Sequence, residues 1–282
     1  MATTSLSVLT WNINRRAENV LGPLVSLADL PDVVTLQEVN LLHEAPIRRR
    51  LEDLGYAVVS SGDSAATTKR YGNMIAAAGR LARSDPSSFG FPWRQLVAHA
   101  TLDRAGGLVN VVTVHVPNGS GNGWKKIDAL EALRRLVLSL KGAPLVLTGD
   151  FNEPRFEKVQ DGRIVTWGQE QCDGRWLPWD VWTFDGVTDT GDRWDTAVRW
   201  FFEATVESGI RNAFWDAAGH GEMAASHYCR KKPRWFDHVF VSGEFQVDSC
   251  EYLHSFREHG FSDHSALLAS LSYNDALTNG CS

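Results

Sequence analysis

The sequence contains little cysteine and no long apolar run. Its four cysteines form no Cys-x-x-Cys pair, which argues against a zinc site or a redox centre and favours a reducing compartment over a disulfide framework. No apolar stretch approaches the length that a bilayer requires, and residues 1–5 lack the basic region and apolar core of a signal peptide. We therefore expect a cytoplasmic protein without a membrane partner.

An excess of positive charge is absent as well. The 28 lysines and arginines are outnumbered by 34 aspartates and glutamates, which gives a net charge of −6. A domain that binds duplex nucleic acid regardless of sequence is usually basic, so the composition argues mildly against a general duplex binder. Hydrophobic residues make up 43% of the chain, which is enough for a substantial core.

The most informative segment is TGDFNEP, residues 148–154, which follows the apolar run Ala143 to Leu147. The run is typical of a buried strand, and the glycine permits a sharp turn after it. Asp150 and Asn152 then lie two positions apart, on the same side of an extended backbone. An acid that accepts a proton beside an amide that stabilises an oxyanion suits ester hydrolysis by activated water. An ordinary turn at a strand end is the alternative, since Gly, Asp and Asn all form turns.

Other strings also place polar residues at the ends of strand-like segments. They are TWNIN (10–14), LQEV (36–39), VHVPNG (114–119), and the pair FDH (236–238) and SDHSAL (262–267). A polar group next to a buried strand destabilises the fold if it is left unpaired. Each of these side chains therefore requires a partner.

The apolar pattern alternates short strands with helices. Helical periodicity covers residues 17–27, 43–54, 125–140 and 196–206. Strand-like segments lie near residues 56–60, 72–79, 94–103, 108–115, 144–148, 237–242, 246–254 and 266–271. Strands bounded by helices indicate layered packing, here two sheets covered on the outside by helices.

Taken together and in this order, the five strings resemble those of the endonuclease/exonuclease/phosphatase superfamily. This group includes exonuclease III, the abasic-site endonucleases, pancreatic deoxyribonuclease, neutral sphingomyelinases and inositol polyphosphate phosphatases. The resemblance extends from residue 6 to about residue 271. It implies an α/β fold, namely a four-layer α/β/β/α sandwich of two mainly antiparallel sheets flanked by helices, and metal-dependent hydrolysis of a phosphate ester.

The resemblance implies a site for a divalent metal ion. Glu38 looks like the carboxylate that binds the catalytic metal, with Asn12 beside it and Asp263 as a further ligand. Oxygen atoms of this kind suit Mg²⁺, for which Mn²⁺ can substitute. Abasic-site endonucleases usually carry aspartate where this chain has Asn14, so a second metal is in doubt. The alternative for Asn12 and Glu38 is a purely structural role as a cap at the end of a strand.

The same resemblance implies the catalytic groups. Asp150 looks like the family's water-activating or metal-side aspartate, and Asn152 like its phosphate-binding amide. Our mechanistic hypothesis is that Asp150 activates the water and that Asn118 donates to the phosphoryl oxygens together with Asn152. His264 is expected to contact the scissile phosphate, and Asp237 to orient that histidine through a hydrogen bond.

Position 115 combines the patterns of two branches of the superfamily. The exonuclease III branch usually has an aromatic residue before the Val-Pro-Asn segment, whereas deoxyribonuclease-like and phospholipase-like members have histidine. We expect His115 to act as the acid for the leaving group or as another phosphate donor; a buried structural histidine is the alternative. His238 has no such support and is expected to be structural.

Two basic clusters adjoin these strings and are expected to bind substrate. The first is Arg230, Lys231, Lys232 and Arg234, and the second includes Lys125, at the start of the helix after Asn118. Short charge runs are often only solvated surface. Their position beside the site strings favours phosphate binding.

The candidate site residues extend from Asn12 to His264, so neither half of the chain could build the site alone. We therefore predict one catalytic domain over residues 1–272 and a C-terminal tail over 273–282. Residues 155–235 form an insertion that holds most of the 11 tryptophans. These rings are interpreted as core packing, and a platform for unpaired bases is the alternative.

The leading hypothesis is a monomeric Mg²⁺-dependent phosphodiesterase that hydrolyses nucleic acid, DNA rather than RNA, with water activated by Asp150. The alternative is a phospholipid or inositol-phosphate phosphoesterase of the same superfamily, which His115 and the acidic composition favour. A binding module without catalysis would be expected to lack the acids at positions 38, 150, 237 and 263, and all four are present.

Overall fold

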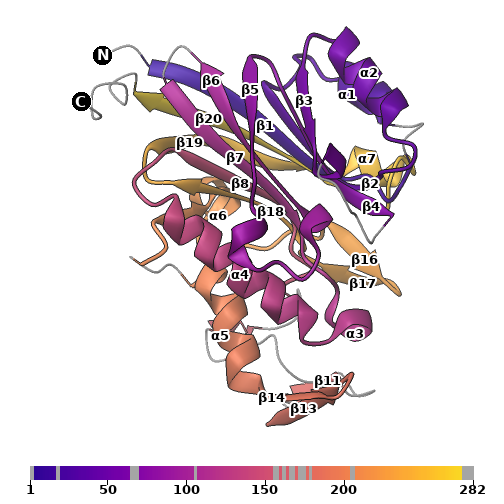
Figure 1. Ribbon diagram of the computed structural model, residues 1–282, viewed down its shortest axis with the longest axis vertical. Helices are drawn as coiled ribbons and strands as arrows, with labels where there is room; N and C mark the ends of the chain where they lie inside the picture. Colours follow the sequence, from indigo (N-terminus) through magenta and orange to yellow (C-terminus); the bar gives the residue numbers. More distant parts are fainter. Residues whose placement is uncertain are drawn as a thin grey trace.

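Two six-stranded β-sheets pack face to face and carry helices on their outer sides (Figure 1). This computed structural model describes residues 3–16, 20–63, 70–104, 107–154, 159–160, 163–164, 169–170, 176–177, 180–203 and 207–274. Within these residues, no helix is both long and apolar enough to cross a membrane.

The first sheet has the strand order β19-β20-β1-β2-β4-β3. Its strands are β1 (Thr3–Asn12), β2 (Val33–Asn40), β3 (Ala57–Ser60), β4 (Tyr71–Ala77), β19 (Phe245–Leu253) and β20 (Ala266–Asn274). Only β1 and β2 pair in parallel among its described strands; the other neighbours are antiparallel.

The second sheet has the order β15-β18-β8-β7-β6-β5. Its strands are β5 (Arg80–Ser84), β6 (Val97–Arg104), β7 (Gly107–His115), β8 (Leu145–Asp150), β15 (Ile210–Asn212) and β18 (Asp237–Ser242). Here β7 and β8 are the parallel pair, and the other described neighbours are antiparallel. The prediction of two mainly antiparallel sheets is confirmed.

The helices form two outer layers. The first sheet is covered by α1 (Leu21–Val25), α2 (Ala45–Asp53) and α7 (Ser255–Glu258), and the second by α4 (Lys125–Ser139) and α5 (Gly191–Phe202) (Figure 1). Two shorter helices are α3 (Gly119–Asn122) and α6 (Ala213–Ala218). Three apolar cores result, one between the sheets and one beneath each helical layer. This arrangement is the four-layer sandwich that the sequence predicted.

Short hairpins and turns complete the described chain. The hairpins are β9 (Val159–Gln160) with β10 (Arg163–Ile164), β11 (Gln169–Glu170) with β12 (Trp176–Leu177), β13 (Val181–Phe184) with β14 (Val187–Thr190), and β16 (His227–Cys229) with β17 (Lys232–Arg234). The 3₁₀ turns are η2 (Ser61–Asp63), η3 (Ser87–Phe89) and η4 (Arg94–Leu96). Apolar periodicity did not indicate these elements because each is too short to repeat a pattern.

Several predicted boundaries differ from the structure. The helix predicted over residues 17–27 is only α1, and the one predicted over 196–206 begins earlier, at Gly191, with residues 204–206 outside the described part. Strand β20 continues to Asn274, and Tyr273 is buried and paired with Thr4. The predicted tail from residue 273 therefore begins inside a strand, and residues 275–282 are not described.

The tryptophans of the 155–235 segment pack inward wherever their side chains are described. Trp194, Trp200, Trp215 and Trp235 are buried in the core between the second sheet and its helices, and Trp182 packs against that core. The interpretation as core packing therefore holds for these five rings. The side chains of residues 167, 176 and 179 lie outside the described residues.

The faces that the two sheets turn toward each other change from apolar to polar along each strand. In β1 the residue order on this face is Val8, Thr10 and Asn12, and in β8 it is Val146, Thr148 and Asp150. The two-residue period of a strand places every second side chain on one face. One end of the space between the sheets is therefore an apolar core, and the other end is a polar site.

Candidate active site

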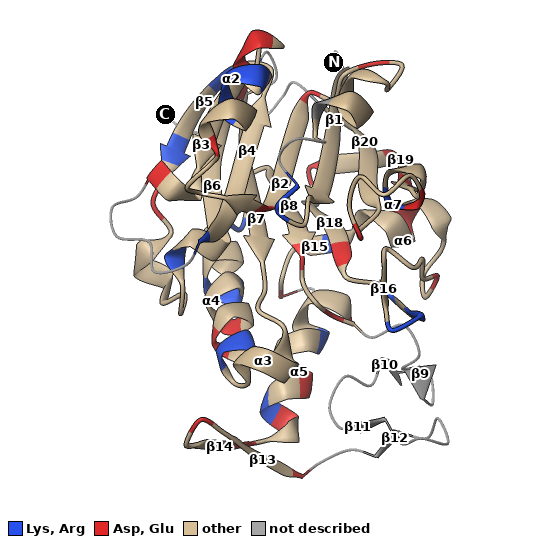
Figure 2. Cartoon of the chain, turned by 90° about the vertical axis from the view of Figure 1, so that its right-hand side faces the viewer, with Lys and Arg blue, Asp and Glu red and all other residues tan. Residues whose placement is uncertain are grey.

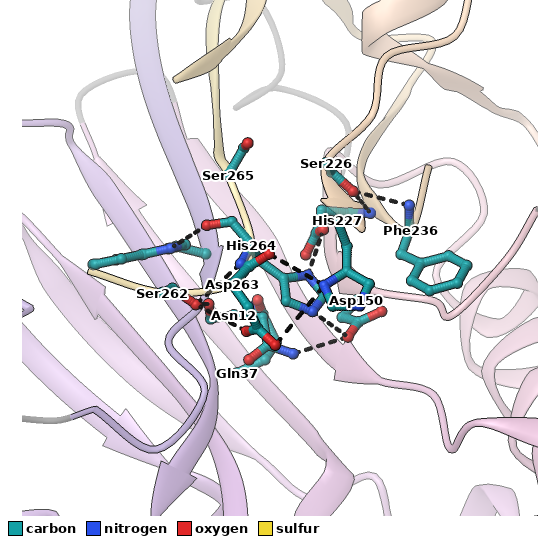
Figure 3. A network of polar contacts seen from close by, with 12 residues as sticks. Asn12, Gln37, Asp150, Ser226, His227, Phe236, Ser262, Asp263, His264 and Ser265 are labelled. Carbon is teal, nitrogen blue, oxygen red and sulfur yellow. Dashed lines mark hydrogen bonds and ion pairs between the residues drawn. The ribbon is translucent and has the colours of Figure 1, made fainter. Parts of the chain in front are cut away.

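The polar strand ends surround a pocket of about 400 Å³. Strands from both sheets contribute, so residues from distant parts of the chain meet (Figure 3). The lining side chains include most of the predicted catalytic residues, although not the buried Asp237: Asn14, Arg15, Glu38, Tyr71, Trp93, Leu96, His115, Pro117, Asn118, Asn122, Asp150, Asn152, His227, Phe236, Asp263 and His264.

Asp150 is at the centre of the hydrogen-bond network. Its Oδ2 accepts a 2.8 Å hydrogen bond from the Asn12 side-chain nitrogen, and its Oδ1 accepts one of 2.8 Å from the Asn152 main-chain nitrogen. The Nε2 atoms of His115 and His264 lie 3.7 and 3.9 Å from Oδ2. A carboxylate held on both oxygens has a fixed orientation, which a group that positions water requires.

Gly149 allows Asp150 to reach this position. Its φ is 138°, and a Cβ atom there would lie 1.9 Å from the carbonyl oxygen of Val114 on β7. Only glycine accommodates both the conformation and the close approach of β7 to β8.

A bulge in β2 directs Glu38. The register of β2 on β4 shifts between Leu36 and Val39, and Glu38 has a φ of 55°. This left-handed conformation is uncommon for a residue with a side chain, and such strain is concentrated at functional sites. The Glu38 carboxylate lies 3.8 Å from His115 Nε2 and 3.4 Å from Arg15 Nε.

Asn12 uses its NH₂ group rather than its oxygen toward the acids. The nitrogen donates to Asp150 and lies 3.4 Å from Glu38 Oε1, while the oxygen accepts from the Asn14 main-chain nitrogen at 2.9 Å. Ser262 fixes the Asn12 main chain through a 2.7 Å hydrogen bond. In this geometry the Asn12 NH₂ group contacts both carboxylates. Its role as a metal ligand stays a prediction.

His264 is held between two acids. Its Nδ1 donates to the fully buried Asp237 at 2.8 Å. Its Nε2 faces Asp150 (Figure 3). Burial lowers the pKa of His264, but the charge and hydrogen bond of Asp237 and the charge of Asp150 outweigh it and raise that pKa to about 10. The ring is therefore a cation at neutral pH. Asp237 and His264 form the pair that the sequence predicted.

His227, at the base of the β16–β17 hairpin, is a site residue that the sequence did not indicate. Its ring stacks on that of His264 with centroids 4.4 Å apart, and its Nδ1 lies 3.1 Å from the Asp263 carbonyl oxygen (Figure 3). Burial and the charge of His264 lower its pKa. No motif of the sequence marks His227, because only the folding of the hairpin against the segment before β20 brings it to the pocket.

The predicted phosphate donors Asn152 and Asn118 also line the pocket. Asn152 has a φ of 52°, and its side-chain nitrogen donates to the Val116 carbonyl at 2.9 Å, which leaves its second N–H for a ligand. Asn118 is exposed. Its side-chain oxygen accepts a hydrogen bond from the Gly121 main-chain nitrogen and so caps α3. This cap fixes the direction of the Asn118 NH₂ group.

The predicted basic residues fall into two groups. Arg230 and Lys231 form the turn of the β16–β17 hairpin and are exposed together with Lys232, which gives the hairpin a basic tip (Figure 2). Arg234, in contrast, is only 9% exposed and donates to the Pro233 carbonyl. The structure does not place Arg234 on the surface that a substrate would meet.

Lys125 reaches only the edge of the pocket. It is exposed, and its Nζ lies 5.9 Å from the ring centroid of Trp93, which lines the pocket. Tyr71, also in the lining, has the Arg15 guanidinium 5.0 Å from its ring centroid. Together with Phe236, these rings are the aromatic part of a lining that also holds acids and amides.

The donor chemistry of the pocket fits a hard divalent cation. The Glu38, Asp150 and Asp263 carboxylates line one pocket; the Asp263 side chain is 46% exposed, and its Oδ2 lies 3.9 Å from His227 Nδ1. Oxygen-rich sites of this kind are typical of Mg²⁺ and Mn²⁺. Two groups of acids and histidines that could hold a metal also occur among the described residues, His227–Asp263–His264 and Asp150–Asp237–His264. His264 is common to both groups.

The acid-and-amide pocket at the polar end of the two packed sheets is a site suited to hydrolysis by activated water. The sequence profile of the Endonuclease/Exonuclease/phosphatase family matches residues 9–264. The chain therefore belongs to this family, whose members are hydrolytic phosphodiesterases and nucleases. The predicted family, fold and enzyme class are confirmed. No curated protein matches the chain.

Solved structures share the fold at low sequence identity. The 3′ phosphatase NExo from Neisseria, bound to a product DNA hairpin, has a TM-score of 0.65 at 20% identity and covers 94% of this chain and 98% of its own. An AP endonuclease from Archaeoglobus fulgidus has a TM-score of 0.65 at 18% identity over the same shares. TDP2 from D. rerio, complexed with a single-strand DNA product, has a TM-score of 0.59 at 14% identity and covers 95% of this chain and 99% of its own.

Proposed function

We propose that this protein is a Mg²⁺-dependent phosphodiesterase that hydrolyses nucleic acid, with Mn²⁺ as a substitute ion. The observation that carries the proposal is the convergence of Asp150, Asn12 and the Asp237–His264 pair, from both sheets, on one pocket. Phosphoryl transfer requires positioned water and neutralised phosphoryl oxygens, and little other chemistry from the protein.

Asp150 positions and deprotonates the attacking water. Its two oxygens are oriented by Asn12 and by the Asn152 main chain, so the water meets a carboxylate with one fixed direction. A bound divalent ion would supply Lewis-acid stabilisation of the developing negative charge. Glu38 and Asp263 would hold that ion, and Asn12 would keep Glu38 in place.

The phosphoryl oxygens meet donors on two sides. His264, charged at neutral pH and held by Asp237, donates from one side, and the amides of Asn152 and Asn118 donate from the other. Fixed donors of this kind stabilise the transition state more than the substrate because charge on those oxygens increases during the reaction. His115, 3.7 Å from Asp150, protonates the leaving oxygen or adds another donor.

The aromatic rings of the pocket lining favour nucleic acid as the substrate. Tyr71, Trp93 and Phe236 line the same pocket as the acids, and a stacked base contributes about 1–3 kcal/mol in single-strand binders. The basic hairpin tip would follow the phosphate backbone away from the pocket. The relatives bound to a DNA hairpin and to single-strand DNA support DNA as the polymer.

A phospholipid or inositol-phosphate substrate is the second candidate. The net charge of −6 and His115 in place of an aromatic residue favour it. An inositol phosphate has no flat apolar face to stack on these aromatic rings, which is why nucleic acid is preferred.

The test is a hydrolysis panel with single- and double-stranded DNA, abasic duplex, RNA, inositol phosphates and sphingomyelin. Each substrate is measured with Mg²⁺ and with EDTA. We expect metal-dependent cutting of DNA, and a loss of about 10²–10⁴ in rate for Asp150→Asn, as is typical for a lost general base.

Asp248→Asn is the matched control, because Asp248 is exposed on β19 and accepts a hydrogen bond from the Ser272 hydroxyl, far from the pocket lining. It should cut at the wild-type rate. Release of phosphate or headgroup with intact DNA would replace the proposal by the second candidate, and an Asp150→Asn variant with more than a tenth of wild-type turnover would contradict the role of Asp150.

A further inference from the structure

Lys126 is a buried cation directly behind the phosphate-binding wall. It lies on the inner face of α4, and its side chain is 2% exposed. Its Nζ donates to the Asn152 main-chain carbonyl at 2.7 Å and to Glu153 Oε1 at 2.8 Å. Glu153 is also 2% exposed. Burying two charges is costly, and an apolar pair of similar size is often as stable or more so. Stability alone is therefore a weak reason for these two residues.

The pair lies where the regular pairing of β8 ends. Up to Phe151 the chain is held by main-chain bonds, with Val116 donating to the Asp150 carbonyl and Phe151 donating to the Phe236 carbonyl, both at 2.8 Å. Beyond Phe151 the carbonyls need other partners, because buried carbonyls are rarely left unbonded. Side chains supply those partners.

Two side chains from different elements bind the next two carbonyls in succession. Lys126 from α4 binds the Asn152 carbonyl, and His238 Nε2 from β18 donates to the Glu153 carbonyl at 2.8 Å. His238 is fully buried, and the Asn212 side-chain nitrogen lies 3.4 Å from its Nδ1. Nε2 thus carries the proton that the carbonyl accepts.

The bonds hold a strained residue. Asn152 has a φ of 52°, a conformation that costs free energy for a residue with a side chain. If residues 152–153 relaxed, the Asn152 main-chain bond to Asp150 and its side-chain bond to the Val116 carbonyl would both change, because both depend on this backbone conformation.

We propose that Lys126 is a positioning residue that, with Glu153 and His238, clamps the backbone of residues 152–153. The clamp keeps the Asn152 amide directed at the scissile phosphate and the Asn152 N–H on Asp150. Lys126 acts through Asn152 and does not touch the substrate, in contrast to its exposed neighbour Lys125. The proposal rests on the phosphodiesterase function proposed above.

The kinetic test replaces both charges, so that no unpaired ion is left in the core. Lys126→Met with Glu153→Met should fold and should lower kcat about tenfold to a hundredfold, which is less than the loss of about 10²–10³ expected for Asn152→Ala. KM should change less than kcat, because the Asn152 side-chain amide stabilises the transition state more than the bound substrate. Lys141→Met is the matched control, because Lys141 is exposed, donates to the Glu207 carbonyl and lies outside the pocket lining; it should retain the wild-type kcat.

Coupling distinguishes positioning from a purely structural role. In an Asn152→Ala background, the Lys126→Met/Glu153→Met change should lower kcat by a clearly smaller factor than in the wild-type background, because the side chain that it positions is gone and only the main-chain bond to Asp150 remains. Full additivity of the two losses, or wild-type kcat in the folded Lys126→Met/Glu153→Met protein, would overturn the clamp.

A measurement on the unmodified protein tests the clamp without activity. The Asn152 main-chain N–H should exchange with solvent as slowly as the N–H groups of the β8 strand, although it lies outside regular pairing. Exchange at the rate of an exposed loop would overturn the clamp, whatever the hydrolysis panel shows. Slow exchange in a protein that cuts no nucleic acid would support the clamp and reject only the proposed substrate.

Discussion

At the scale of single residues, each functional group is held by another protein group. Asp150 is bonded on both oxygens, His264 is held by Asp237, and Glu38 lies beside Asn12 and Arg15. Such bonds fix rotamers in advance, so little reorganisation is needed during the reaction. The same principle applies to buried residues without a catalytic role.

His238 provides a prediction about pH and stability. Burial lowers its pKa from 6.5 to about 4, against the opposing effect of the carbonyls that it binds. Between pH 6.5 and 4 the unfolded chain binds a proton that the folded protein excludes, so the free energy of unfolding falls as the pH falls through this window. The decrease in the free energy of unfolding that His238 causes reaches about 3 kcal/mol near the folded-state pKa and is absent above about pH 7.

Urea unfolding of the wild type and of His238→Gln, from about pH 7 down to about pH 4.5, measures this loss. Glutamine keeps a side-chain donor for the carbonyl but does not titrate in this range. The wild-type free energy should fall more steeply than that of the variant. Parallel curves would show that His238 does not contribute.

At the scale of elements, the close approach of β7 and β8 allows the site to form. Main-chain atoms of Val114 lie so near Gly149 that a Cβ there would meet the carbonyl oxygen at 1.9 Å. We expect Gly149→Ala to lower the free energy of unfolding by about 3 kcal/mol or more, since overpacking and an unfavourable φ act together.

Gly142→Ala is the control for the effect of the positive φ alone, without a steric clash. Gly142 has a φ of 86°, and a Cβ added to it would meet nothing within 4 Å, so its substitution should cost about 1 kcal/mol. Urea denaturation of both variants measures the difference. Equal losses would mean that β7 and β8 can separate without cost.

The β16–β17 hairpin gives a prediction about binding. Its exposed tip carries Arg230, Lys231 and Lys232. Each phosphate contact contributes about 0.7 to the slope of log Kd against log salt for single strands. Replacing all three by alanine should therefore reduce the slope by about 2 in a fluorescence titration of single-stranded DNA. The control is the double variant Arg49→Ala/Arg50→Ala on α2, which lies away from the hairpin (Figure 2). It should leave the slope unchanged. An unchanged slope in the hairpin variant would show that the tip does not contact the phosphates of the DNA.

At the scale of the whole molecule, the active site is an interface between two sheets. The first sheet supplies Asn12 and Glu38, and the second supplies Asp150 and Asp237. Buried polar contacts join the sheets beneath the site, such as the 2.8 Å bond between the Thr35 and Thr148 hydroxyls. A ligand that bridges both sheets should therefore stabilise the entire fold.

Divalent metal binding should show this effect in thermal unfolding. At a Mg²⁺ concentration of about 100 times Kd, binding adds about 2.7 kcal/mol, which raises Tm by roughly 5 °C for a chain of this size. EDTA should abolish the shift, and so should Glu38→Gln. Glu52→Gln, exposed on α2, should retain it. A Mg²⁺-dependent shift that persists in Glu38→Gln would place the ion elsewhere.

The strand ends were predictable because their determinants are local. The apolar runs before Asn12, Glu38, His115 and Asp150 have strand character, and a polar residue after such a run requires a partner. The pairing of Asp237 with His264 followed from the family resemblance, and the structure brings these side chains together. The number of sheets and layers also came from the resemblance, since strand patterns alone were compatible with it without specifying it.

Tertiary structure decided which charges reach the pocket. Lys125 and Lys126 are adjacent in sequence, yet one is exposed and the other is buried against Glu153. His227 reaches the pocket only because its hairpin folds beside His264, whereas Arg234 in the same hairpin is buried. The sequence by itself determined most strands of the two sheets, their polar ends and the family, whereas β5 and β15 were not predicted. Burial and orientation of individual side chains depend on contacts between distant segments, which no local pattern encodes.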